Sequence, residues 1–237
     1  MVHHEAWPPE RLAKWIAVLV LITMVAGGFG EAYVPSKLIA ARDPLATATN
    51  VLQSHVLFRL GFASYVIEGL CDAALTALLY LLLKPAGREL ALIAAFFRIV
   101  STAAFASAQT FYFAALPILK GAPYLQFPPG QLDSLALISL KFSVVGGMVP
   151  TLFYGVSWMV LGYLIYVSRY LPKWLGMLMA FAGACFVVEN FGLILAPAYS
   201  SDLFLAPMAI AMLVLAGWLV IRGVDGGKWR ERTAIAG

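Results

Sequence analysis

Charged residues are scarce in this 237-residue chain. Only 12% of the residues are Asp, Glu, Lys or Arg, 62% are hydrophobic, and the mean hydropathy is +0.87. Soluble domains carry about 25% charged residues, so this composition excludes an ordinary soluble fold. Once several membrane spans are allotted, only short loops remain, and we expect residues 1–237 to form a single membrane domain.

Cysteine and histidine are also rare. Cys71 and Cys185 lie in apolar stretches without the spacing of a metal or redox site, which indicates buried thiols and no disulfide. His55 stands alone, apart from His3 and His4 near the N-terminus. The sequence therefore predicts no metal site, no haem and no other cofactor.

What the chain does have is long hydrophobic runs. A hydrocarbon core of about 30 Å needs about 20 apolar residues per helix, and six segments meet that length. They predict an all-α, polytopic transmembrane bundle with spans at residues 15–33, 54–83, 89–116, 135–168, 174–196 and 203–220. Glycines and Pro150 interrupt residues 131–168, which form either one kinked helix or a surface helix plus a span, and we favour the kinked helix.

The basic residues predict the orientation. Ten lie in the N-terminal segment, the second loop, the fourth loop and the tail, and four lie on the other side of the predicted spans. Because Lys and Arg accumulate on the cytoplasmic side, both termini are predicted to be cytoplasmic. The same distribution at span ends, without one basic patch, argues against nucleic acid as a partner.

Ionisable residues inside the spans are the informative feature. Ser64, Glu68, Asp72 and Thr76 recur every four residues on the second span, and Arg98 and Gln109 share a face of the third. Asp72 lies fourteen positions before Ala86 in the tight turn and Arg98 lies twelve after it, so the two should lie level and pair. This pairing leaves Glu68 as a second acid near mid-membrane, either held protonated or sharing Arg98, and so makes proton or cation coupling at Glu68 a hypothesis.

A second polar group is predicted nearer the outer face. It contains Glu31 at the end of the first span, Arg59 early in the second, and Glu189 with Asn190 in the fifth. Glu cannot reach far along a helix towards the interface, whereas Lys and Arg can. These residues indicate either an outward-open polar pocket or interfacial side chains, and the sequence leaves both open.

Several short segments carry a family resemblance. They include Gly30 to Ile39, Leu57 to Phe62, Leu82 to Pro85, Phe96 to Arg98 and Tyr170 to Pro172. The chain resembles, over nearly its whole length, a family of bacterial six-helix membrane proteins known only as a domain of unknown function. The resemblance implies the six-span topology and a location in a bacterial inner (plasma) membrane. It places Glu31, Arg59 and Arg98 in recognisable segments and implies no activity.

Three functions remain open. The first is binding or transport of a small polar or amphiphilic ligand through a charged intramembrane pocket, with the lipid bilayer and that ligand as partners. The second is a structural or regulatory membrane subunit whose buried charges only fix helix packing. The third is an intramembrane enzyme, for which no activated nucleophile, base or phosphate loop is visible, so no catalytic residue is assigned.

Overall fold

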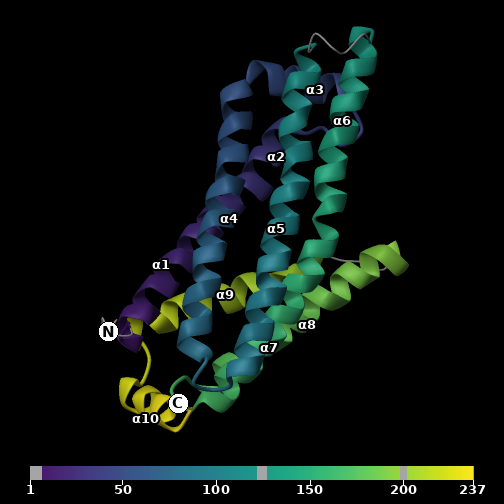
Figure 1. The fold of residues 1–237 in the computed structure, drawn as a ribbon. Helices are drawn as coiled ribbons and strands as arrows, with labels where there is room; N and C mark the ends of the chain where they lie inside the picture. The colour runs from purple at the N-terminus through teal and green to yellow at the C-terminus, as the bar shows by residue number, and fades with distance from the viewer. Residues whose placement is uncertain (1–6, 122–126, 198–201, 237) are drawn as a thin grey trace. The chain divides into compact units, whose positions relative to one another are not determined.

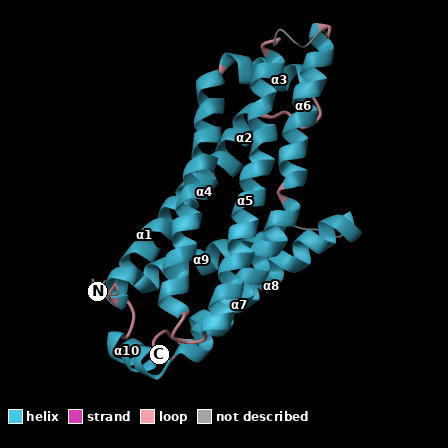
Figure 2. Cartoon of the chain, in the orientation of Figure 1, coloured by secondary structure: helices cyan, strands magenta, loops and turns pink. Residues whose placement is uncertain are grey.

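The computed structural model describes residues 7–121, 127–197 and 202–236, and helices joined by short loops and turns make up most of these residues (Figure 1, Figure 2). Within these residues, six helical segments are long and apolar enough to cross a membrane. They are Pro9–Leu38, His55–Leu83, Arg88–Leu119, Gly130–Ser168, Lys173–Leu195 and Leu203–Ile221. The predicted all-α fold with six membrane-spanning segments is confirmed, and the protein is a multi-pass membrane protein.

The elements follow one another in chain order. The first span consists of α1, a π-helical turn and α2; α3 lies between the first two spans, and a 3-10 turn precedes the last span. The bounds are α1 Pro9–Gly27, π-helix Gly28–Tyr33, α2 Val34–Leu38, α3 Pro44–Gln53, α4 His55–Leu83, α5 Arg88–Leu119, α6 Pro129–Gly146, α7 Met148–Ser168, α8 Lys173–Leu195, 3-10 turn Asp202–Leu205, α9 Ala206–Ile221 and α10 Gly226–Ala236.

Most predicted spans agree with these bounds to within a few residues, and two differences, in α5 and α3, have physical causes. The helix α5 continues through Pro117, because a proline so close to a helix end removes only one of the last backbone hydrogen bonds. Residues 131–168 form α6 and α7, interrupted only at Gly147. The helix α3 was not predicted; Asp43 starts it by accepting a hydrogen bond from the Ala46 amide at 2.9 Å.

The structure separates into two compact units. The first unit contains residues 1–22, 71–102 and 151–237, and the second contains residues 23–70 and 103–150. The boundaries fall inside α1, α4, α5 and α7.

Aromatic packing forms the core of the second unit. Tyr112 of α5 stacks on Phe58 of α4 with ring centroids 4.3 Å apart, and meets Tyr65 edge-on at 5.3 Å. Val34 and Leu140 are buried in the same cluster. This cluster ties α2, α4, α5 and α6 together.

Glycines hold α7 and α8 together in the first unit. Gly155 and Gly162 are seven residues apart on α7, and Gly176 and Gly183 are seven apart on α8. A Cβ atom at Gly176 would lie 2.5 Å from the carbonyl oxygen of Gly162, and one at Gly183 would lie 2.5 Å from that of Gly155. The two backbones are therefore in direct contact at two levels, which small residues permit between membrane helices.

Candidate functional site

The first unit contains a buried ion pair between Asp72 of α4 and Arg98 of α5. Arg98 Nη2 donates to Asp72 Oδ1, and the Arg98 and Asp72 side chains are only 1% and 9% exposed. Thr102, one turn after Arg98, donates its hydroxyl to Asp72 Oδ2 at 2.6 Å. The turn at residues 84–87 places α4 and α5 in register, so the structure brings together the acid and base that the sequence placed at equal depth.

Two aromatic rings of α7 surround the guanidinium. The Arg98 Cζ atom lies 4.7 Å from the ring centroid of Tyr154 and 5.2 Å from that of Trp158. Arg98 Nη2 also donates to the Tyr154 hydroxyl at 3.2 Å. Desolvated cation–π contacts of this kind stabilise a buried arginine by about 2 kcal/mol.

Three buried donors at this centre remain without a hydrogen-bond acceptor among the described residues. They are Arg98 Nε, Arg98 Nη1 and Trp158 Nε1. Trp158 is completely buried and Arg98 is 1% exposed, so bulk solvent does not reach these donors. An unsatisfied buried donor costs about 1–3 kcal/mol, and a charged one costs more. Native interiors leave few such groups without a reason.

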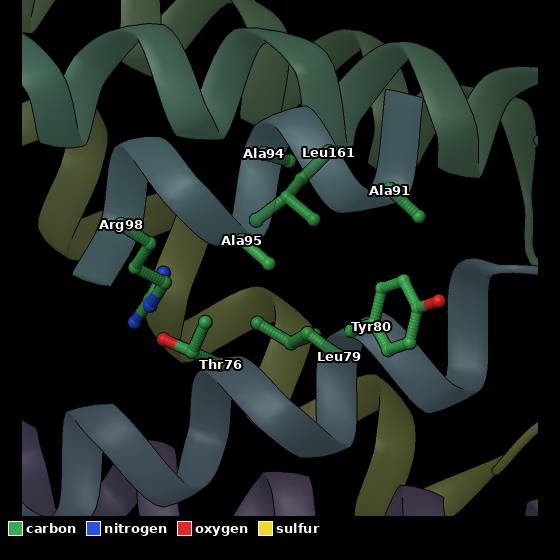
Figure 3. A pocket seen from close by; sticks show the side chains of 8 residues that line it. All are labelled: Thr76, Leu79, Tyr80, Ala91, Ala94, Ala95, Arg98 and Leu161. Carbon is green, nitrogen blue, oxygen red and sulfur yellow. The ribbon is translucent and has the colours of Figure 1, made fainter. Parts of the chain in front are cut away.

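Arg98 lies at one end of a crevice between α4 and α5 (Figure 3). The crevice contains about 160 Å³ of space not occupied by atoms, in gaps too narrow to hold a water molecule as the side chains stand. Alanines of α5 and Leu161 of α7 form much of its wall, and Thr76 and Tyr80 of α4 contribute hydroxyl groups. The crevice is thus mostly apolar, with Arg98 as its one charged group.

Glu68 and Glu31 belong to the second unit. The half-buried Glu68 carboxylate packs against Gly27, where an added Cβ atom would lie 3.1 Å from Oε1. Glu31 lies in the π-helical turn at the surface of the chain. Both carboxylates are close enough to Tyr65 to interact with it electrostatically, and the Tyr65 hydroxyl donates to the Gly30 carbonyl at 2.8 Å. Sharing of Arg98 by Glu68 stays a prediction.

The remaining candidate residues are divided between the units. Gln109 is buried on α5 and Arg59 is exposed on α4, both in the second unit. Glu189 and Asn190 are buried on α8 in the first unit, and Asn190 Nδ2 donates to the Phe186 carbonyl at 2.8 Å. An outer pocket formed by Glu31, Arg59 and Glu189 together stays a prediction.

Tyr154 and Trp158 are the site residues that the sequence did not reveal. They are four residues apart and therefore share a face of α7. That spacing was a usable signal, but aromatic residues are so frequent in this chain that the spacing alone did not single them out.

Among the described residues, no group of three His, Cys, Asp or Glu side chains is placed to hold a metal ion.

Comparison with known proteins gives a family but no activity. The chain is 25% identical over 179 residues to an uncharacterised protein of Archaeoglobus fulgidus, and the aligned region covers 73% of this chain and 93% of that protein. No solved structure matches this chain. The model of the domain of unknown function DUF4386 matches residues 16–223, which include both α4 and α5 and the Asp72–Arg98 pair. The chain therefore belongs to the DUF4386 family.

Proposed function

We propose that this membrane protein binds a small polar or amphiphilic ligand at Arg98, inside the first unit. The observation that carries the proposal is the set of three buried N–H donors, Arg98 Nε, Arg98 Nη1 and Trp158 Nε1, that have no acceptor among the described residues. A pair that served packing alone would gain stability by satisfying these donors. A ligand oxygen placed beside them would remove the cost of leaving them unpaired.

The charge at the centre restricts the chemistry of this ligand. Asp72 already offsets the guanidinium charge of Arg98, and both of its oxygen atoms accept hydrogen bonds from protein groups. A second anion would therefore approach a carboxylate with no additional cation to balance it. A neutral oxygen acceptor, such as an amide or ester carbonyl or a hydroxyl, fits the donors better.

The crevice next to Arg98 gives the ligand its apolar surroundings. Its alanine and leucine walls suit a hydrocarbon chain, while Thr76 and Tyr80 offer hydroxyl groups. Because its gaps are narrower than a water molecule as they stand, the ligand must part the side chains of α4 and α5 when it enters. Binding of this kind would order the crevice and stabilise the folded protein.

The test uses ten-carbon amphiphiles that differ only in the head group. Protein in lipid nanodiscs is titrated with decanamide, decanol or decylamine, and the indole N–H resonance of Trp158 is followed by ¹⁵N NMR, with Trp158→Phe to assign it. We expect decanamide or decanol to shift this resonance, and protonated decylamine, which has no acceptor, to leave it unchanged. Arg98→Lys keeps the charge but removes the forked donors, and should weaken binding about tenfold.

A control variant and one negative result complete the test of ligand binding at Arg98. Trp174→Phe is the matched control, because Trp174 of the same unit is half-exposed and packs on Trp218, whereas the rings over Arg98 are those of Tyr154 and Trp158. Decanamide should shift the Trp158 resonance in this variant as in the unmodified protein. A Trp158 resonance that responds to none of the acceptor-bearing probes would overturn the proposal.

A structural role for the ion pair is the second candidate function. The favouring observation is that each carboxylate oxygen of Asp72 already accepts a hydrogen bond from the protein, one from Arg98 and one from Thr102. Removing one member of a buried pair leaves an uncompensated charge and costs about 3–5 kcal/mol. On this hypothesis, Asp72→Arg combined with Arg98→Asp recovers part of the stability that each single variant loses, and no probe binds.

A further inference from the structure

The last helix, α10, lies outside all six spans and outside the residues matched by the family model. It runs from Gly226 to Ala236, whereas the last span ends at Ile221 and the family match ends at residue 223. The helix carries three basic residues and one acidic residue: Lys228, Arg230, Arg232 and Glu231. Its charge distinguishes it from the apolar helices that precede it.

Hydrogen bonds hold α10 against the ends of two membrane helices in the first unit. The buried Trp229 donates its indole N–H to the Leu82 carbonyl at 2.9 Å, and Arg232 donates to the Val167 carbonyl at 3.2 Å. Leu82 and Val167 are in the last turns of α4 and α7. At 1.5 Å per residue the 29-residue α4 is about 44 Å long, which matches the about 40–45 Å thickness of a bilayer with its head groups, so contacts at its end place α10 at the depth of the head groups.

This docking leaves basic side chains at the surface. Lys228 and Arg230 flank Trp229 along the chain, so they leave α10 about 100° to either side of it. Their side chains are 58% and 62% exposed. The intramolecular partners are exposed as well: Asp225 lies 2.9 Å from Lys228 Nζ, and Glu10 lies 3.5 Å from Arg230 Nη1. Exposed pairs are weak, so an external anion can compete for both cations.

We propose that Lys228 and Arg230 bind the phosphate groups of anionic phospholipids and so fasten α10 to the membrane surface. Charge complementarity selects this partner, because head-group phosphates are the anions present at the depth where α10 is held. Each cation near an anionic surface strengthens binding about fivefold. This surface is separate from Arg98, so the inference does not depend on the proposed ligand.

The experiment measures which lipids remain bound. The full chain is placed in nanodiscs containing equal amounts of phosphatidylglycerol and phosphatidylcholine, and native mass spectrometry gives the ratio of the two lipids retained. The double variant Lys228→Gln, Arg230→Gln should lose most of the preference for phosphatidylglycerol, about fivefold for each cation removed. Lys228→Arg with Arg230→Lys should keep it.

A control variant tests the competition between the lipid and an intramolecular partner. Glu10→Gln removes the carboxylate that pairs with Arg230, keeps both cations of α10, and should raise the proportion of phosphatidylglycerol retained. Hydrogen exchange of the α10 backbone amides establishes that the helix stays docked in each variant. Equal lipid ratios in the unmodified protein and the Lys228, Arg230 double variant, with α10 protected in both, would overturn the proposal. A lower proportion of phosphatidylglycerol in the Glu10→Gln variant would overturn it as well.

Discussion

Replacing Gly176 by Ala should destabilise the protein, although alanine is the better helix former. The new Cβ atom would lie 2.5 Å from the Gly162 carbonyl oxygen and 2.6 Å from the Tyr166 amide nitrogen. Ordinary contact begins at 3.4 Å, so α7 and α8 must move apart by about 1 Å at this level. The atoms in the way belong to the backbone and cannot rotate aside.

The expected magnitude combines two opposing effects. Alanine in a helix interior is favoured over glycine by about 1 kcal/mol. Overpacking a close contact costs about 1–3 kcal/mol, and separating the helices also loosens the second contact between Gly155 and Gly183. We therefore expect Gly176→Ala to lower the free energy of unfolding by up to about 2 kcal/mol.

Gly217→Ala provides a control with the opposite expected sign. Gly217 is in α9 of the same unit, and a Cβ atom there would meet nothing within 4 Å. Gly217→Ala should therefore raise the free energy of unfolding by about 1 kcal/mol, because alanine has the higher helix propensity and no atom stands in the way of its Cβ. Reversible unfolding in mixed detergent micelles, followed by far-UV circular dichroism, measures both variants. If Gly176→Ala proves as stable as Gly217→Ala, the two backbones are not in contact and the reasoning fails.

Three further predictions concern single polar groups. Thr102→Val removes the 2.6 Å hydrogen bond to Asp72 while keeping the volume, and should cost about 1–3 kcal/mol in the same unfolding assay; no loss would show that another donor reaches that carboxylate. Burial raises the pKa of the Tyr170 phenol, so at neutral pH its hydroxyl is protonated and donates to the Leu82 carbonyl at 2.8 Å. Tyr170→Phe removes this hydrogen bond and should lower the free energy of unfolding by about 1 kcal/mol, measured by thermal unfolding. Asp225 accepts hydrogen bonds at the start of α10, and these lower the pKa of its carboxyl below 3.8. The stabilisation of α10 by the ionised carboxylate is therefore present above pH 3.8 and is lost as the pH falls through the lowered pKa. Hydrogen exchange at the first-turn amides of α10 should therefore accelerate in Asp225→Ala at neutral pH, and unchanged exchange would exclude this cap.

The ion pair could be predicted from the sequence because helix geometry and one turn determine it. The turn of residues 84–87 connects α4 to α5 directly, so counting residues in both directions gives the depth of Asp72 and of Arg98. The four-residue spacing of the polar side chains then gives the face on which each lies. Local rules are sufficient when the partners are neighbours across a tight turn.

The aromatic rings around Arg98 could not be predicted in the same way. Tyr154 and Trp158 reach the guanidinium only because α7 has one particular rotation about its axis. Part of that rotation is set by the contacts of Gly155 and Gly162 with α8, which lies later in the chain. Such packing depends on the shapes of two helices at once, and hydropathy does not encode it. The proposed grouping of Glu31 with Glu189 depended on the same kind of long-range information.

The docking of α10 has a consequence for how the ends of the membrane helices are solvated. The last carbonyl groups of any helix lack partners within the helix, and at a membrane surface they usually bond to water. Here Trp229 and Arg232 supply donors to the Leu82 and Val167 carbonyls from a segment that follows the family match. The chain therefore supplies, from its own C-terminal segment, donors that would otherwise come from interfacial water at the ends of α4 and α7.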